Sequence, residues 1–223
     1  MRFISNMAAF EEQRNRLVDN LVRRGYISDK AVEAAMRRVP REEFIPPEMK
    51  EDAYADTPLP IGEGQTISAP HMVAIMAEKL DLFPGAKVLE IGAGSGYHAA
   101  VCAEVVASDG HIFTIERIST LATFAEKNLK RTGYSSLVTV IFGDGTRGLP
   151  EHAPYDRIFV AAGAPGIPEP LTDQLKDGGE LLIPVGGRYY QDLIRVRKKG
   201  KDLETENLGG CVFVPLIGEH GYH

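Results

Sequence analysis

The sequence has no tryptophan, only two cysteines and no long apolar run. Cys102 and Cys211 cannot build the set of disulfides that holds many small secreted proteins together, so we expect two buried thiols in a reducing environment. No stretch approaches the roughly 20 consecutive apolar residues that a membrane-spanning helix needs, and segment 1–16 is too polar for a signal peptide. These absences predict a cytoplasmic protein with no membrane partner.

An excess of positive charge is also missing. The 25 lysines and arginines are outnumbered by 31 aspartates and glutamates, which gives a formal net charge of −6. Proteins that bind nucleic acid through its phosphates need clustered Lys and Arg. The arginines from Arg14 to Arg38 are interleaved with acidic residues, and the basic run from Arg195 to Lys201 falls in a predicted hairpin, so we interpret both as solvated surfaces. Nucleic acid is not expected as a partner.

The N-terminal third has the apolar spacing of helices. These stripes predict helices over Phe10–Arg24, from a cap at Ser28 to near Pro40, and over Glu48–Tyr54. The proline-punctuated connector Asp56–Gly62 follows.

A polar loop, Gly64–Met72, precedes a predicted helix over Pro70–Leu80. Ser68 or Ala69 would lie at the cap of this helix, with proline in its first turn. On residue types alone, the whole segment is interpreted as a loop and a helix cap.

A short apolar strand followed by three glycines stands at the centre of the chain. The strand, Val88–Ile91, leads into Gly92, Gly94 and Gly96 and then into a helical pattern over Tyr97–Val106. Glycine lets the backbone turn sharply and approach a ligand closely, so this is the first half of a nucleotide-binding βαβ unit. The spacing is G-x-G-x-G and not the G-x-G-x-x-G of dinucleotide sites, and by itself it does not identify the ligand.

Two acidic residues follow the next two predicted strands. Glu116 closes the strand His111–Glu116 and lies 20 residues after Gly96 (116 minus 96), where a carboxylate can accept hydrogen bonds from ribose hydroxyls. Asp144 follows the strand Val138–Phe142, where an Asp-Gly turn is the alternative interpretation. Since ligands of open α/β sheets bind outside the carboxyl ends of the strands, these features together predict a nucleoside site.

The remaining pattern completes a mostly parallel α/β fold. Helices are predicted over Leu121–Arg131 and Pro168–Leu175, strands over Tyr155–Ala162 and Lys176–Val185, and an antiparallel C-terminal pair over Asp192–Lys198 and Gly210–Leu216.

In combination, these motifs resemble those of a class I S-adenosylmethionine-dependent methyltransferase, with a Rossmann-like doubly wound sheet. A closer resemblance, covering nearly the whole chain, is to the protein-L-isoaspartate O-methyltransferases. The segments that carry it are Gly64–Met72, Val88–Tyr97, Gly143–Gly145, Ala153–Asp156, Leu175–Gly179 and Val212–Leu216. The Thr-Ile-Ser-Ala-Pro-His stretch that begins at Thr66 is the most specific of them.

The resemblance implies methyl transfer from S-adenosyl-L-methionine to the free carboxylate of L-isoaspartyl residues in damaged proteins and peptides, with S-adenosyl-L-homocysteine as the product. It also implies one catalytic domain over 1–223, acting as a monomer. Segment 1–80 would be a helical extension with the substrate and cofactor loop, and segment 81–223 the cofactor-binding core. A carboxylate with an ordinary pKa of about 3.9 needs no general base at neutral pH. The absence of a catalytic triad or metal-ligand motif is therefore expected.

Individual roles also follow from the resemblance. Ser68 is the expected catalytic residue, because its hydroxyl can donate to the acceptor carboxylate. Glu116 would hold the ribose hydroxyls and Asp144 the adenine amino group, while Ile217 stands where animal relatives often carry a threonine. The expected cofactor-binding residues are Gln65, Thr66, Ile67, His71, Glu90, Gly92, Gly94, Gly96, Glu116, Gly143 and Asp144. The expected substrate-binding residues are Thr66, Ser68, Ala69, Val214, Pro215 and Leu216.

Two other classes of function stay open on the residues alone. One is a methyltransferase of the same fold with a small-molecule or other acceptor, although the chain has no N-P-P-Y-type motif for amino-group methylation. The other is a non-catalytic nucleoside-binding module. A nicotinamide dehydrogenase ranks last, because the third glycine comes one residue early.

Overall fold

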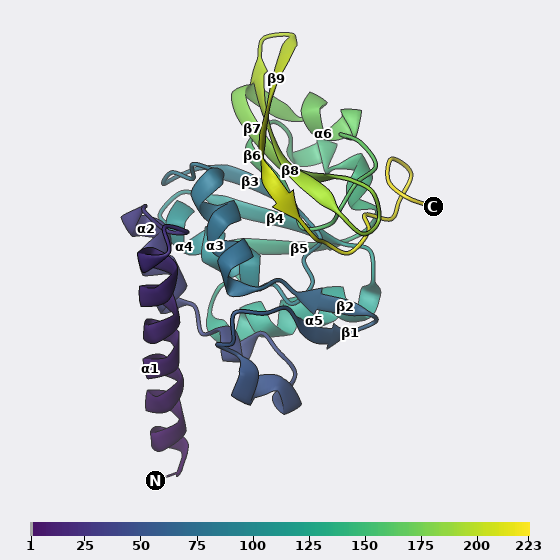
Figure 1. Cartoon of the computed structure of the whole chain (residues 1–223). Coiled ribbons are helices and arrows are strands. Elements are labelled where there is room, and N and C mark those ends of the chain that lie inside the picture. The colour runs from purple at the N-terminus through teal and green to yellow at the C-terminus, as the bar shows by residue number, and fades with distance from the viewer. Residues whose placement is uncertain (1) are drawn as a thin grey trace.

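A seven-stranded sheet forms the centre of the protein, in a computed structural model that describes residues 2–223, with side chains from residue 8 onward (Figure 1). Its strands are β3 (Lys87–Ile91), β4 (His111–Glu116), β5 (Val138–Phe142), β6 (Tyr155–Val160), β7 (Leu175–Gly186), β8 (Gln191–Lys199) and β9 (Asp202–Cys211). The order across the sheet is β5-β4-β3-β6-β7-β8-β9. Strands β3 to β7 run parallel to one another, whereas β8 pairs antiparallel with both of its neighbours, β7 and β9. The fold is therefore the predicted Rossmann-like sheet with an antiparallel C-terminal pair.

The chain winds outward from β3 in both directions, first to β4 and β5 and then to β6 and β7. The point where this order reverses leaves a crevice outside the carboxyl ends of the strands. The glycine-rich turn after β3 lies at this point, so the topology places the candidate site there.

Helices flank the sheet, and the first two form an N-terminal extension that precedes it in the chain. They are α1 (Arg2–Arg23), α2 (Lys30–Arg38), α3 (Pro70–Lys79), α4 (Tyr97–Val106), α5 (Ser119–Thr132) and α6 (Glu169–Asp173), with 3-10 turns η1 (Arg41–Glu43), η2 (Pro47–Asp52), η3 (Gly145–Arg147) and η4 (Pro150–His152). In Figure 1, α1 is the dark purple column that extends away from the sheet. Within the described residues, no helix is both long and apolar enough to cross a bilayer.

Each face of the sheet has its own apolar core. On one face, residues of α1 to α5 and the pair Phe44 and Ile45 after η1 pack with alternate side chains of the strands, including Val88. On the other face, Leu89 and Ile91 pack with Leu171 of α6. Because both faces of β3 are covered, its sequence is an almost continuous apolar run. Both cysteines are free and buried, as predicted.

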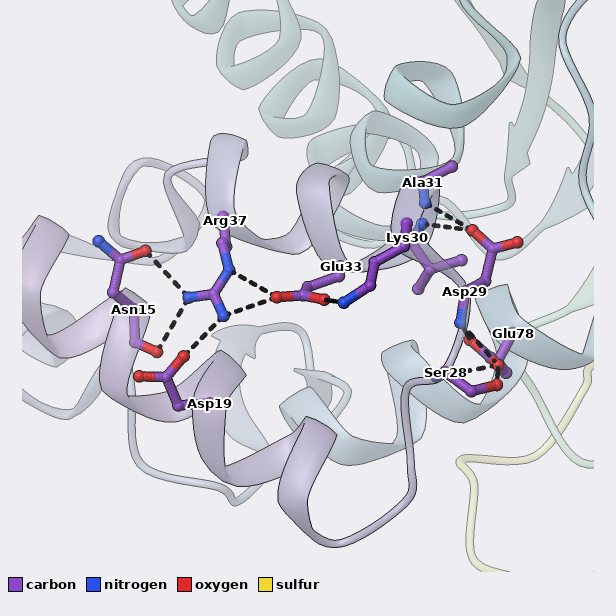
Figure 2. Close-up of polar contacts among 10 residues, drawn as sticks. Asn15, Asp19, Ser28, Asp29, Lys30, Ala31, Glu33, Arg37 and Glu78 are labelled. Carbon is purple, nitrogen blue, oxygen red and sulfur yellow. Dashed lines mark hydrogen bonds and ion pairs between the residues drawn. The ribbon is translucent and has the colours of Figure 1, made fainter.

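Polar contacts join the N-terminal helices to one another (Figure 2). The Arg37 guanidinium on α2 donates to Asp19 of α1 at 2.6 Å and to Glu33 one turn away at 2.8 Å. The predicted cap at Ser28 is wrong. Asp29 caps α2 by accepting from the first backbone N–H groups, while Ser28 donates to Glu78 of α3.

The connector before α3 is a β-hairpin that the sequence did not predict. Strand β1 (Leu59–Gly62) pairs antiparallel with β2 (Gln65–Ile67), with a bulge between Pro60 and Gly62. Both turn residues have positive φ, 53° at Glu63 and 68° at Gly64. This turn geometry is usually marked by Asn-Gly or Asp-Gly, so glutamate at the first position hides the signal.

The predicted last strand is also misplaced. Strand β9 ends at Cys211, and the segment Val214–Leu216 bonds instead to Gly163, just beyond β6. Residues 202–207 of β9 are exposed on both faces of this edge strand. They therefore lack the apolar alternation by which a strand is recognised, whereas the apolar segment after β9 packs onto the sheet.

Candidate active site

A cavity lies over the carboxyl ends of β3, β4 and β6, with an empty volume of about 810 Å³ that includes space open to solvent. Five segments supply most of its lining: Gln65–Ser68 from the hairpin and the loop after it, Glu90–Ser95 from β3 and its turn, Ile115–Ile118 at and after the end of β4, Ala161–Ala162 after β6, and Val214–Ile217 near the C-terminus. Volume and position are typical of a small-ligand site at a topological switch point.

The glycine turn forms the floor of this cavity. Gly92 and Gly94 have φ values of 95° and 52°, which L side chains rarely adopt. The Gly92 N–H donates to the Ile115 carbonyl at 2.8 Å, which ties the turn to β4. A Cβ at Gly94 would lie 3.3 Å from the side chain of Ile61 in the hairpin, so the turn lies close beneath β1.

Glu116 is fixed by two backbone donors at the end of β4. Its Oε2 accepts from the Gly94 N–H at 2.9 Å, and its Oε1 accepts from the Ile118 N–H at 3.0 Å. Each carboxylate oxygen can accept a further hydrogen bond. The carboxylate is therefore oriented before any ligand arrives, in the position predicted for binding ribose hydroxyls.

Glu90 is a fully buried acid in the same wall. Its Oε2 accepts from the Thr114 hydroxyl at 2.6 Å, whereas its Oε1 has no partner among the described residues. Burial raises the pKa of Glu90 to about 8, the Thr114 hydrogen bond opposes this rise, and the nearby Glu116 carboxylate adds to it. Without a ligand, Glu90 is therefore mostly protonated at neutral pH.

Ser68 lies half-buried in the part of the cavity wall between β2 and α3. The N-cap of α3 is Ala69, and no side chain caps the helix there. No hydrogen bond to another described residue engages the Ser68 hydroxyl. The alternative role of Ser68 as a helix cap is therefore not supported, and its hydroxyl remains available to a ligand.

The C-terminal segment closes a third side. The Leu216 N–H donates to the Gly163 carbonyl, and the Gly163 N–H donates to the Val214 carbonyl, both at 2.8 Å. These two bonds hold Val214, Pro215 and Leu216 against the end of β6, where all three line the cavity. The segment therefore lines the same cavity as Ser68.

Not every predicted site residue lines the cavity. His71 points to Asp56, whose carboxylate lies 2.8 Å from the His71 Nδ1. The Asp144 carboxylate accepts from Thr146 and from the Glu219 N–H at 2.9 Å, so it holds the C-terminal tail. Burial raises the pKa of Asp144, but these hydrogen bonds outweigh burial and leave the pKa below its ordinary value. Three further predicted residues lie outside the lining, namely Ala69, Gly96 and Gly143.

The structure also brings in residues that were not predicted. Those lining the cavity are Val73, Ile91, Ala93, Ser95, Tyr97, His98, Ile115, Arg117, Ile118, Leu121, Gly145, Ala161, Ala162 and Ile217. Several directly follow β4 or β6 and could have been found from the rule that sites lie at strand carboxyl ends. Among the described residues, no group of three or more His, Cys, Asp or Glu side chains could hold a metal ion.

Comparison with known proteins agrees with this geometry. The chain matches the family described as protein-L-isoaspartate(D-aspartate) O-methyltransferase over residues 12–221. The protein-L-isoaspartate O-methyltransferase of Hyperthermus butylicus is 61% identical, with 96% of this chain and 92% of the relative covered. That of Methanopyrus kandleri is 58% identical, with 96% and 95% covered.

A solved structure supports the same assignment. A chain from Plasmodium falciparum described as a protein-L-isoaspartate O-methyltransferase, in complex with S-adenosyl-L-homocysteine, superposes with a TM-score of 0.82. It is 32% identical and covers 92% of this chain and 98% of its own length. The glycine floor, the Glu116 carboxylate and the Ser68 loop surround one cavity. The family match and the identity to these relatives show that the chain belongs to the protein-L-isoaspartate(D-aspartate) O-methyltransferase family.

Proposed function

We propose that this protein transfers a methyl group from S-adenosyl-L-methionine to the free carboxylate of L-isoaspartyl residues in damaged proteins and peptides. The observation that carries this proposal is the half-buried Ser68, which caps no helix and faces the same cavity as the glycine turn and Glu116. One wall thus suits a nucleoside donor, and the other offers a hydroxyl to an acceptor.

The residues of the donor wall fit S-adenosyl-L-methionine. Glu116 has accepting capacity left on both oxygens, the Gly92 and Gly94 backbone leaves room for a close approach, and the Glu90 Oε1 has no partner among the described residues. When bound, this donor supplies a methyl group on a positively charged sulfur, which is a good leaving group. We propose that Glu116 holds its ribose, and that the wall from Gln65 to Ile67 covers its methionine side.

The acceptor side needs orientation rather than acid–base chemistry. An isoaspartyl carboxylate is already ionised at neutral pH, so the protein does not have to remove a proton from it. We propose that the Ser68 hydroxyl donates to one carboxylate oxygen and turns the other toward the donor. The edge Val214–Leu216 would hold the extended peptide. Rate enhancement then comes from alignment and from excluding water around the attacking oxygen.

A labelling experiment tests the proposed acceptor. The protein is incubated with methyl-labelled S-adenosyl-L-methionine and either an isoaspartyl peptide or its aspartyl twin. We expect label only on the isoaspartyl peptide. Label on neither peptide, with the donor still bound in calorimetry, would favour a class I methyltransferase with another acceptor; no donor binding would favour a non-catalytic module.

Ser68→Ala separates the acceptor role from donor binding. We expect this variant to lose at least about tenfold in turnover, because an aligned hydrogen bond to a charged group contributes about 1.5–3 kcal/mol, while its affinity for S-adenosyl-L-homocysteine stays within about twofold. Ser136→Ala is the matched control, since Ser136 is exposed at the amino end of β5, away from the cavity. Equal turnover in both variants would remove Ser68 from the mechanism.

We also propose that the protein is a cytoplasmic monomer and a single domain, with isoaspartyl proteins as its partners. The two free, buried cysteines support a reducing compartment such as the cytoplasm. Light scattering at micromolar concentration tests the proposed monomeric state. A dimer mass would contradict it.

A further inference from the structure

Two polar atoms in the cavity wall have no hydrogen-bond partner among the described residues. They are the Oε1 of Glu90 and the Nε2 of His98, and both are buried. Buried polar atoms almost always have a partner, so each exception calls for an explanation. The other such atoms belong to Arg14, Arg41 and Glu180, none of which lines the cavity. The pair at Glu90 and His98 is therefore associated with the site.

His98 lies in the first turn of α4 and reaches the strand beyond β3. Its ring packs against that of Phe159 in β6, with the ring centroids 4.4 Å apart and the ring planes tilted by 47°. Because β3 lies between β4 and β6, Glu116 is at one side of the glycine turn and His98 is toward the other. A donor whose ribose lies at Glu116 would extend its amino-acid end across β3 toward Glu90 and His98.

The two side chains suit a zwitterionic group. An amino-acid end carries an ammonium, which donates hydrogen bonds, and a carboxylate, which accepts them. Burial lowers the pKa of His98 to about 3, so its ring is neutral and offers one donor and one acceptor nitrogen. Glu90 adds a carboxyl group with one free oxygen. Both buried atoms would then find partners only when the ligand carries its amino-acid end.

We propose that His98 is a further donor-binding residue, which hydrogen-bonds the amino-acid end of S-adenosyl-L-methionine beside Glu90. This inference rests on the proposed function only for the identity of the donor and does not depend on the acceptor. It distinguishes His98 from a core residue that merely packs on Phe159, because a packing role would not depend on the far end of a ligand.

The test compares two ligands by calorimetry. S-adenosyl-L-homocysteine carries the amino-acid end, whereas 5′-methylthioadenosine shares the nucleoside and the sulfur but lacks it. We expect His98→Leu to weaken the first by at least about tenfold, which corresponds to 1.4 kcal/mol, and to leave the second within about twofold. We expect His98→Gln, which restores a hydrogen-bonding side chain, to recover most of the lost affinity.

Cys102→Ala is the matched control, because Cys102 is buried one turn further along α4 and does not line the cavity. It should affect both ligands equally if at all. Equal weakening of both ligands in His98→Leu, or no weakening of either, would overturn the proposal. Should His98→Leu fail to fold, the ¹⁵N signal of His98 in the unmodified protein decides the question. It should shift on adding S-adenosyl-L-homocysteine and not on adding 5′-methylthioadenosine, and the same response to both would contradict the proposal.

These outcomes are independent of the acceptor assay. A protein that labels no isoaspartyl peptide can still discriminate the two ligands through His98. That result would contradict the proposed function and leave this inference standing. A protein that labels the peptide but loses no discrimination in His98→Leu would sink this inference alone.

Discussion

Glu90 illustrates how a single buried acid couples the site to stability. Its carboxyl is fully buried at the end of β3, its pKa is raised from an ordinary value near 4.5 to about 8, and its only described partner is Thr114. Between these two pH values the folded protein holds a proton that the unfolded chain releases. The free energy of unfolding must therefore fall as pH rises through this window.

Glu90→Gln should remove that dependence in the ligand-free protein. The unmodified chain is expected to lose up to about 5 kcal/mol of stability between pH 4.5 and 8, taken as an upper limit from the size of the shift. The variant should have a flatter profile in urea unfolding measured across the same range. Thr114→Val serves as the control, because loss of the hydroxyl should move the window to higher pH. Identical slopes for Glu90→Gln and the unmodified chain would contradict the assignment.

Residue types predicted some of the site and could not predict the rest. Glu116 and Gly94 were predicted because an acid at a strand end and a glycine-rich turn leave local signals, whereas Ser68 was predicted only from the family resemblance of its loop. His98 was not found, because a histidine inside an apolar helical pattern carries no sign of the cavity that tertiary packing opens beside it. For Asp144, the sequence could not indicate that the C-terminal tail would bond to its carboxylate.

The hairpin of β1 and β2 forms part of the cavity wall. It supplies Gln65 and Thr66 to the lining, and Glu63 in its turn accepts from the Thr120 hydroxyl of α5 at 2.9 Å. The hairpin has two short strands of its own and no place in the main sheet. Its turn geometry should therefore control how firmly the cavity is covered.

Gly64→Ala tests this dependence. An alanine at φ 68° should cost about 1–2 kcal/mol in the hairpin, and release of S-adenosyl-L-homocysteine in stopped-flow measurements should become about five- to thirtyfold faster if this cost falls on the covered state. Gly133→Ala is the matched control, since Gly133 has φ 87° at the end of α5 with open space around it. Equal release rates for the two variants would show that the hairpin does not hold the ligand.

The hairpin and β9 also differ from the other strands in how well the sequence predicts them. Strands β4 and β5 and helix α4 begin and end as predicted, because buried apolar runs and helical spacing are strong local signals. The hairpin was missed, since Pro60 and Glu63 replace the usual strand and turn residues. Strand β9 was misplaced, since an exposed edge strand needs no apolar alternation.

At the scale of the whole molecule, the N-terminal helices and the sheet share one core. Val18 and Leu21 of α1 belong to the same buried cluster as Val88 of β3 and Val101 of α4. Helix α2 packs on α1, α3 and α4 and joins the extension to the fold. The extension is therefore expected to unfold together with the sheet.

Leu21→Ala tests whether the N-terminal extension and the sheet unfold together. Leu21 is 1% exposed, so truncation should destabilise the protein by about 2–5 kcal/mol. Urea unfolding followed by circular dichroism and by tyrosine fluorescence should keep coincident midpoints, both shifted downward. Val212→Ala, at a side chain 70% exposed, should change little. Two separate transitions would show that the extension unfolds independently.

The wall from Gln65 to Ser68 lines the cavity, and in the proposed function it both covers the donor and carries the hydroxyl that holds the acceptor. Any movement of this wall that lets a spent nucleoside leave would also take apart the place where the carboxylate is held. If donor and acceptor are held as proposed, we expect the donor to bind before the peptide and the peptide to leave before S-adenosyl-L-homocysteine does. Inhibition by S-adenosyl-L-homocysteine should accordingly compete with the donor and not with the peptide; competition with the peptide would contradict this order.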